Sequence, residues 1–234
     1  MQKEYLKGSK SLANIFKWLG YKRKFAREHP DYFDPSGTLI FCGAQGYGKT
    51  LSAVQYVVKL ANAYPRSILV TNVAIDQSAF PEGYDIREYN GLDDLKNICN
   101  GEYGVIYLID EIHLELNSLE SKNVDVDIMV EISQQRKQRK HIVGTSQIYG
   151  RMAKPLREQI RDVVLCKCYF GCFQFNKLID AFESQEKDGK LEAMVKARLL
   201  WFHNPDLYSL YDTYQKMRRY NQEWQGRKRK EVLE

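Results

Sequence analysis

The chain has 234 residues, of which 44% are hydrophobic and 28% are charged, and its formal net charge is +5 at pH 7. This length can bury a sizeable core and fits one domain with elaborations better than two equal domains. No apolar run reaches the roughly 18 residues that a transmembrane helix needs, and the five cysteines are too sparse and odd in number for a disulfide framework. The N-terminus lacks the apolar stretch of a secretory signal, so we expect a cytoplasmic protein. A location at the surface of a membrane is the alternative.

Residues 1–35 are predicted to form a basic, amphipathic helical segment. Lys and Arg outnumber Asp and Glu in this segment and again in residues 217–234, which favours contact with a polyanion, although frayed, charged termini show the same composition. Four apolar residues recur at helical spacing: Leu12, Ile15, Phe16 and Leu19. We favour a helix that packs on its own domain or on a neighbouring subunit; a helix on a membrane surface is the alternative.

A loop containing Pro and Gly at residues 29–37 precedes the predicted core, residues 36–170. Apolar runs predict strands at residues 38–42, 67–72, 103–111, 141–147 and 162–170. Helical patterns lie between them at residues 49–64, 91–100 and 126–140. Strands that are apolar throughout and separated by helices indicate an α/β fold, with a mainly parallel central sheet covered by helices on both faces.

The last predicted segment, residues 171–234, has a different character. Two alternating runs flank Asp188-Gly189, a dipeptide that favours a tight hairpin turn. We therefore expect a β-hairpin over residues 172–203 that adds to the α/β core, followed by a basic C-terminal tail.

The stretch "GAQGYGKT" matches the pattern G-x-x-x-x-G-K-[ST], and it follows a predicted strand and opens a predicted helix. Glycines allow successive main-chain N–H groups to face phosphate oxygens, and the helix adds its own N-terminal N–H groups and dipole. The residues expected to bind ATP are Gly43, Ala44, Gln45, Gly46, Tyr47, Gly48, Lys49, Thr50 and Leu51. Lys49 would reach the β- and γ-phosphates, and the Thr50 hydroxyl would ligate Mg²⁺.

A second polar pair ends the apolar run "VIYLIDE" at Asp110 and Glu111. The carboxyl ends of parallel strands meet the nucleotide edge of an open α/β sheet. We expect Asp110 to hold the Mg²⁺ shell, through water, and Glu111 to orient and polarise the attacking water. Together with the phosphate loop, this pair predicts ATP hydrolysis.

The run "HIVGTSQ" also ends in polar residues, and its strand is predicted to insert between the acidic strand and the strand before the phosphate loop. Gln147 would then sense the γ-phosphate or position the water, because its amide both donates and accepts. The alternative is an ordinary polar strand end.

Several arginines flank this strand. Arginine often supplies positive charge to a phosphoryl-transfer transition state from a neighbouring subunit. The candidates are Arg136, Arg139 and Arg157. A solvated surface charge is the alternative for each of them.

Taken together, the stretches "FCGAQGYGKTLSAV", "VIYLIDEIH" and "QQRKQRKHIVGTSQIYGRMAKPLREQ" resemble the FtsK–HerA division of P-loop ATPases. Within that division the chain is similar to the zonula-occludens-toxin-like proteins of phages, over roughly residues 36–170. The resemblance implies an ATP-driven motor that moves DNA for packaging or virion assembly, as a ring and usually a hexamer, with a phage portal or coat protein as a possible partner. It also implies that Lys49 and Thr50 bind nucleotide and Mg²⁺, that Asp110 and Glu111 act in hydrolysis, and that Gln147 is the sensor.

The sequence departs from the filamentous-phage assembly ATPases, which carry a transmembrane helix after the ATPase domain. This difference favours a DNA-packaging or translocation motor. Two alternatives stay open: an assembly or secretion ATPase that acts on protein at a membrane, with residues 11–25 as a docking helix, and a nucleotide-gated binding module with little turnover.

Overall fold

A computed structural model describes residues 11–117, 126–147, 149, 157–181, 185–187, 190–192 and 194–212. The chain divides into two compact units, Met1–Tyr32 and Phe33–Glu234. In the first unit, helix α2 (Ala13–Glu28) buries none of its residues, and Phe16 is 75% exposed. The helix confirms the helical periodicity of this segment, while its packing partner stays a prediction, as do the three predicted segment boundaries.

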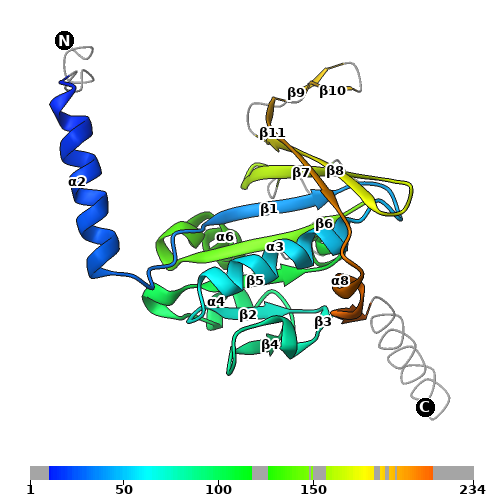
Figure 1. The fold of residues 1–234 in the computed structure, drawn as a ribbon, viewed down its shortest axis with the longest axis horizontal. Helices are drawn as coiled ribbons and strands as arrows, with labels where there is room; N and C mark the ends of the chain where they lie inside the picture. Colours follow the sequence, from blue (N-terminus) through cyan, green and yellow to red (C-terminus); the bar gives the residue numbers. More distant parts are fainter. Residues whose placement is uncertain are drawn as a thin grey trace. The chain divides into compact units, whose positions relative to one another are not determined.

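The second unit is built on a mixed sheet (Figure 1) with the strand order β11-β8-β7-β1-β6-β5-β2-β4. Neighbouring strands from β7 to β4 run parallel, and β8 and β11 are added antiparallel at one edge. The strands are β1 (Gly37–Cys42), β2 (Ile68–Thr71), β4 (Ile86–Glu88), β5 (Val105–Ile109), β6 (Lys140–Ser146), β7 (Ile160–Tyr169), β8 (Phe173–Asp180) and β11 (Val195–Phe202). The predicted α/β fold with a mainly parallel sheet is confirmed.

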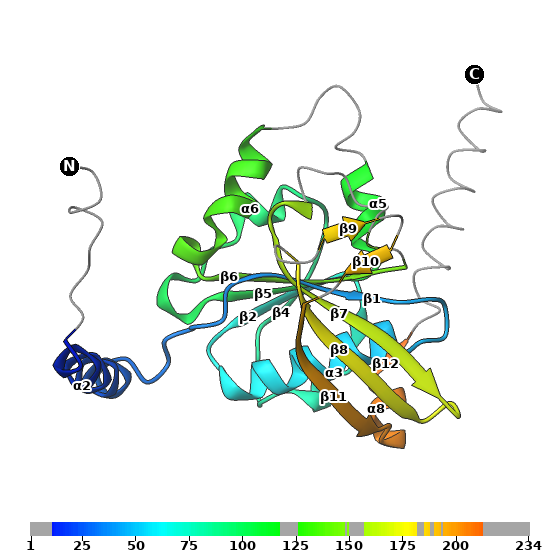
Figure 2. The same ribbon diagram turned by 90° about the horizontal axis from the view of Figure 1, so that it is seen from above.

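Helices cover both faces of this sheet (Figure 2). Side chains alternate along a strand, so neighbouring residues of β1 belong to different cores. Leu39 and Phe41 pack in the core with helix α3 (Lys49–Ala63). Ile40 and Cys42 pack in the other core with helices α4 (Asp94–Asn97) and α6 (Val126–Gln138). Because both faces are buried, the strands read as continuous apolar runs in the sequence.

The predicted C-terminal hairpin is confirmed, since β8 pairs antiparallel with β11. A small second pair, β9 (Gln185–Lys187) and β10 (Lys190–Glu192), extends between them; Asp188 and Gly189 lie outside the described residues. The prediction that residue 170 belongs to a strand is wrong. Phe170 has a φ of 56° and is 95% exposed, because it forms the turn between β7 and β8.

Several short elements were not predicted. After β11 the chain forms helix α8 (Pro205–Ser209) and strand β12 (Tyr211–Asp212), which pairs with β3 (Ala74–Ile75). Helix α5 (Ile112–Asn117) follows the acidic pair, and two 3₁₀ turns occur at Gln77–Ala79 and Gly101–Tyr103. Within the described parts of the chain, no helix is both long enough and apolar enough to cross a membrane.

Candidate nucleotide-binding site

The phosphate loop, residues 43–50, connects β1 to α3 and requires glycine for two different reasons. A Cβ on Gly43 would lie 2.7 Å from the main-chain oxygen of Cys166 in the neighbouring strand β7. Gly48 caps α3 in the left-handed region, with φ 71° and ψ 26°, and a Cβ there would overlap Oε1 of Gln174. The loop therefore packs against β7 and β8 closely enough to exclude side chains from its inner turn.

Lys49 starts α3 and is buried, with 8% of its surface exposed. Its Nζ donates a hydrogen bond to the main-chain oxygen of Ala44, at 3.2 Å. The side chain thus lies across the loop and keeps a positive charge beside the N-terminal N–H groups of α3. This combination of ammonium, main-chain N–H groups and helix dipole suits a phosphate group.

Thr50 and Asp110 meet at this edge of the sheet although 60 residues separate them. The Thr50 hydroxyl donates to Oδ1 of Asp110 at 3.0 Å, and the Thr145 hydroxyl donates to the same oxygen at 2.6 Å. Asn72 holds the main chain of Asp110, accepting from its N–H at 2.8 Å and donating to its carbonyl at 3.2 Å. A hydroxyl and a carboxylate in contact beside a phosphate loop form the oxygen donor set that suits Mg²⁺.

Glu111 follows in a left-handed conformation, with φ 52°. A residue other than glycine adopts this conformation only where its surroundings stabilise it, and such residues gather at functional sites. Here the N–H of Glu111 donates to the Thr145 hydroxyl at 2.9 Å, and its Oε2 lies 3.2 Å from Nδ1 of the buried His113. The carboxylate is therefore fixed next to Asp110 while remaining partly exposed.

Strand β6 lies between β1 and β5, as the sequence predicted. Its last residue, Ser146, pairs with Cys42 at the end of β1, and Gln147 comes directly after it with an exposed side chain. Gln147 therefore follows the carboxyl end of β6, next to the strand that enters the phosphate loop. Its role as a sensor stays a prediction.

Two of the three candidate arginines lie at the opposite edge of the sheet. Arg136 belongs to the last turn of α6, and Arg139 precedes β6. Strand β6 separates them from Gln147 by about 20 Å at the usual rise per residue. Arg157 lies three residues before β7, and its carbonyl oxygen accepts from the hydroxyl of Tyr149, two residues after Gln147, at 3.4 Å. The structure thus does not bring Arg136 or Arg139 to the phosphate loop of their own chain, and action of any of the three on a neighbouring subunit stays a prediction.

A cavity of about 630 Å³ opens over the phosphate loop, and we call it the P-loop cavity. Its volume lies in the range of roughly 300–1,000 Å³ that is common for small-molecule and cofactor sites. The lining includes residues of the loop, Asp110 and Glu111, and a wall that the sequence did not predict: Cys168, Gly171, His203, Tyr208 and Tyr211. Asn72 and His113 also belong to the site and were missed, although Asn72 directly follows the buried strand β2 and His113 is the second residue of α5, just after the acidic pair.

Hydrogen bonds connect this wall to the loop, and we call them the Gln174 network. Gln174 is fully buried; its Nε2 donates to the main-chain oxygen of Tyr47 at 3.0 Å and to Oδ1 of Asn176 at 2.7 Å. Asn176 donates to the Ser52 hydroxyl of α3 at 3.1 Å. On the other side, Oε1 of Gln174 lies 3.0 Å from Nε2 of His203, whose Nδ1 contacts the Tyr208 hydroxyl.

The directions of these bonds follow from the chemistry of the groups. Burial lowers the pKa of His203, which favours a neutral ring. Because both hydrogens of the Gln174 amide are used by Tyr47 and Asn176, its Oε1 accepts, and Nε2 of His203 donates. The Nδ1 atom of His203 then accepts from Tyr208.

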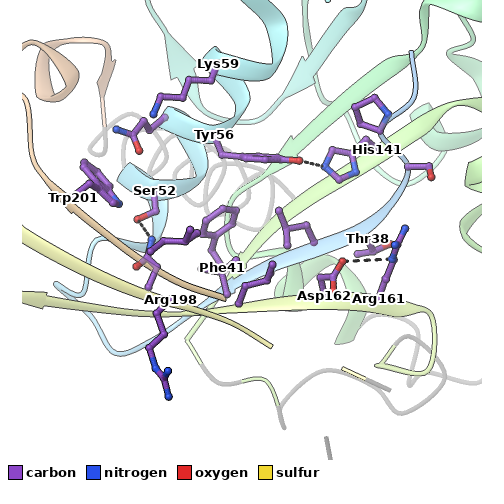
Figure 3. Close-up of a pocket in the computed structure, with 18 of the residues that line it drawn as sticks. Thr38, Phe41, Ser52, Tyr56, Lys59, His141, Arg161, Asp162, Arg198 and Trp201 are labelled. Atoms are coloured by element: carbon purple, nitrogen blue, oxygen red, sulfur yellow. Dashed lines mark hydrogen bonds and ion pairs between the residues drawn. The ribbon is translucent and has the colours of Figure 1, made fainter. Parts of the chain in front are cut away.

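A second hollow of about 820 Å³ lies on the α3 face of the sheet (Figure 3). The Tyr56 hydroxyl lies 2.9 Å from Nε2 of His141, whose Nδ1 lies 3.0 Å from the carbonyl oxygen of Gly37. Burial lowers the pKa of His141 to about 4, so the ring is neutral near pH 7. Asp162 is paired with Lys196 at 2.7 Å. None of the described residues around this hollow lines the P-loop cavity.

By sequence, the chain matches no protein-family profile and no curated protein. By structure, it is similar to the N-terminal domain of zonular occludens toxin from Neisseria meningitidis, with 16% identity and a TM-score of 0.51, over 76% of this chain and 100% of that domain. It is also similar to the genome packaging NTPase B204 from Sulfolobus turreted icosahedral virus 2, solved with AMPPCP. That likeness has 12% identity and a TM-score of 0.50, and it covers 73% of this chain and 98% of that one.

These likenesses concern the fold, and they agree with the resemblance to zonula-occludens-toxin-like proteins that the sequence motifs indicated. The site geometry agrees with them, because the phosphate loop, the acidic pair and the polar end of β6 meet at one edge of the sheet. The chain therefore has the α/β fold of the P-loop NTPases, in the form found in zonular occludens toxin and in a viral packaging NTPase.

Proposed function

We propose that this protein hydrolyses ATP and uses the energy to move DNA. The observation that carries the first part is the contact between Thr50 and Asp110, at 3.0 Å, beside the Lys49 ammonium. It joins the phosphate loop to the acidic strand, and together they provide phosphate binding, a metal site and a carboxylate next to it. The carboxylates of Asp110 and Glu111 are adjacent but have different partners, which suits two different roles. Asp110 accepts from Thr50 and Thr145, whereas Glu111 contacts His113.

Each residue has a defined task in this reaction. The main-chain N–H groups of residues 43–51 and Lys49 bind the phosphates and neutralise part of their charge. Mg²⁺ bound by Thr50 and Asp110 would supply further positive charge to the phosphate oxygens. Glu111 orients a water molecule and accepts its proton as the oxygen attacks the γ-phosphorus; the bond to ADP breaks, and ADP and phosphate leave. Gln147 contacts the γ-phosphate in this scheme.

The second part of the proposal, a motor on DNA, is supported by the charge of the chain and by one of the similar structures. The segment at residues 1–35 and the C-terminal tail are basic, and a basic surface attracts a polyanion. The similar structures include a genome packaging NTPase, B204 of Sulfolobus turreted icosahedral virus 2. We propose a cytoplasmic ring, a hexamer as the resemblance implies, in which Arg136, Arg139 or Arg157 of one subunit acts on the nucleotide of the next. A phage portal or coat protein would be its partner.

The test is the ATPase rate with and without single- and double-stranded DNA, measured together with the mass in solution. We expect DNA to raise the rate, with a steep dependence on salt, and the mass to be that of a ring. Lys49→Ala should abolish ATP binding. Glu111→Gln should abolish turnover and retain binding, whereas a nucleotide-gated binding module would not need Glu111. A protein that stays monomeric and hydrolyses ATP at the same rate with and without either form of DNA would contradict the proposed motor function.

One observation favours a second candidate, an assembly ATPase that works on protein at a membrane surface. Helix α2 exposes a run of large apolar side chains next to basic ones: Phe16 is 75% exposed and Trp18 is 54% exposed. Such a helix can dock on an anionic bilayer. Flotation with vesicles that contain anionic lipid distinguishes the two, because the DNA motor has no need to rise with the vesicles.

A further inference from the structure

The P-loop cavity has two opposite sides, and the strand order defines them. β6 and β7 flank β1 on opposite sides, and β5 lies beyond β6. Asp110 and Glu111 follow β5 and therefore stand on one side of the phosphate loop. Cys168 at the end of β7 and Gly171 in the β7–β8 turn stand on the other. We call this second side, with His203 and Tyr208, the hairpin wall.

A nucleoside triphosphate bound in this cavity has only one orientation that fits the acidic pair. The metal and the γ-phosphate belong at Thr50, Asp110 and Glu111, because hydrolysis occurs there. The chain of phosphates then runs through the loop, and the end that carries the sugar and base emerges toward the hairpin wall. The identity of the nucleoside end therefore depends on the residues of that wall.

Two tyrosines of the C-terminal segment, Tyr208 and Tyr211, line the cavity, and Tyr208 is the more exposed of the two. Its neighbour Leu207 is 7% exposed and packs in the core with α3, whereas Tyr208 itself is 48% exposed. The Asn204 side chain caps α8, and Pro205 starts it. The Leu207 side chain thus packs α8 against the core, and the next side chain, Tyr208, stays exposed toward the cavity. Core packing does not require an aromatic ring at this position.

The Tyr208 hydroxyl and both ring nitrogens of the neighbouring His203 already make polar contacts within the protein. The Tyr208 hydroxyl contacts Nδ1 of His203 and lies 3.3 Å from the carbonyl oxygen of Gly171. Both nitrogens of His203 belong to the Gln174 network, and the His203 ring packs between Trp201 and Tyr208, with ring centroids 4.9 Å and 5.6 Å away. What Tyr208 offers a ligand is therefore the face of a ring held in a fixed orientation.

We propose that the nucleobase of the bound nucleotide stacks on Tyr208, and that the Gln174 network fixes this ring relative to the phosphate loop. The inference rests on the proposed ATPase function and adds the residue that recognises the base. Stacking between a base and an aromatic side chain is favourable for every base. The larger ring system of a purine gains more contact than a pyrimidine, so the site selects a purine nucleoside triphosphate by shape rather than by hydrogen bonds to the base edge.

The experiment measures, by calorimetry on the full chain with Mg²⁺, the affinity for ATP and for inorganic tripolyphosphate, which lacks sugar and base. The variants are Tyr208→Ala, Tyr208→Phe and, as a matched control, Phe170→Ala. Phe170 is an exposed aromatic residue in the β7–β8 turn and is not among the residues that line the cavity.

Tyr208→Ala should weaken ATP binding by roughly tenfold, which is within the range for one stacked base, and should change tripolyphosphate binding by less than about twofold because the phosphate loop stays intact. Tyr208→Phe keeps the ring but loses the contact of its hydroxyl with His203, so it should bind ATP more weakly than the wild type and more tightly than Tyr208→Ala. Phe170→Ala should change the affinity for neither ligand.

Tyr208→Ala with wild-type ATP affinity would overturn the proposal, as would an equal loss for ATP and tripolyphosphate. A Tyr208→Phe variant that binds ATP as weakly as Tyr208→Ala would also overturn it, because the aromatic ring would then contribute nothing to binding. Failure of the wild type to bind either ligand would instead reject the ATPase function itself.

Discussion

The carboxylate of Glu111 lies 3.2 Å from Nδ1 of His113, which is buried directly behind it. The same nitrogen is 3.4 Å from the Ser146 hydroxyl at the end of β6. His113 therefore joins the end of the acidic strand to the neighbouring strand that leads into Gln147. We infer that it is a positioning residue for Glu111.

This relationship predicts different outcomes for two substitutions of His113. Asn places an amide near the position of Nδ1 and can keep the hydrogen bond to Glu111, whereas Leu cannot. We expect His113→Leu to lower kcat by roughly ten- to hundredfold, the cost of a misplaced catalytic group, with the KM for ATP nearly unchanged. His113→Asn should recover most of the rate in steady-state ATPase assays. Equal rates for the two variants would show that the contact has no catalytic role.

Removal of Mg²⁺ tests the oxygen donors at Thr50 and Asp110. Wild-type protein should bind ATP more weakly after addition of EDTA, because the phosphate charge is then neutralised by Lys49 and the main chain alone. Asp110→Asn should lose most of this difference between the two conditions. Asp162→Asn is the control, since Asp162 is a carboxylate paired with Lys196 outside the cavity. If Asp110→Asn responds to EDTA as strongly as the wild type, Asp110 does not hold the metal.

Much of this site could be predicted because its parts have local signatures. The phosphate loop is one contiguous motif between a strand and a helix. Asp110 and Thr145 end apolar strands, and parallel strands bring their carboxyl ends to one edge. The insertion of β6 between β1 and β5 was predicted for a strand that comes next in sequence after the acidic strand, and the sheet order confirms it.

The parts that escaped prediction depend on contacts between distant segments. Gln174 lies within an alternating strand pattern that indicates nothing about the phosphate loop. It reaches Tyr47 only because β8 is folded back beside β7. Tyr208 and His203 likewise enter the site because the C-terminal segment crosses to pair with β3. Two-residue strands such as β3 and β12 carry no periodicity, so only the tertiary pairing defines them.

The packing of Gln174 against the phosphate loop predicts a difference between two glycines. Gly46 and Gly48 both have positive φ, 77° and 71°, so alanine at either position costs roughly 1 kcal/mol or more in conformational strain. A Cβ at Gly46 meets nothing within 4 Å, whereas a Cβ at Gly48 overlaps Gln174. Gly48→Ala should therefore weaken ATP binding far more than Gly46→Ala in calorimetry. Adding Gln174→Ala should recover part of the lost ATP affinity in Gly48→Ala and none in Gly46→Ala. If the two glycine variants behave alike, the overlap with Gln174 is relieved at no cost in free energy.

The neutral, buried His141 predicts how stability depends on pH. Its pKa is lowered from 6.5 to about 4, chiefly by burial, which outweighs the opposite effects of its hydrogen bond to Gly37 and of Asp162. Between these two values the unfolded chain binds a proton at this position and the folded chain does not. The free energy of unfolding should therefore fall as the pH is lowered from 6.5 toward 4, by roughly 3 kcal/mol from this residue.

Urea unfolding at a series of pH values between 7 and 4 measures this contribution. His141→Asn removes the titrating group and should flatten the pH dependence in that window, while lowering stability at pH 7 because the Tyr56 hydroxyl loses its partner. Tyr56→Phe is the matched variant: it removes the same hydrogen bond but keeps the buried imidazole, so it should be destabilised at pH 7 and keep the steep pH dependence. If His141→Asn keeps the wild-type slope as Tyr56→Phe does, other groups dominate the acid sensitivity. His141 would then be protonated in the folded state over this range.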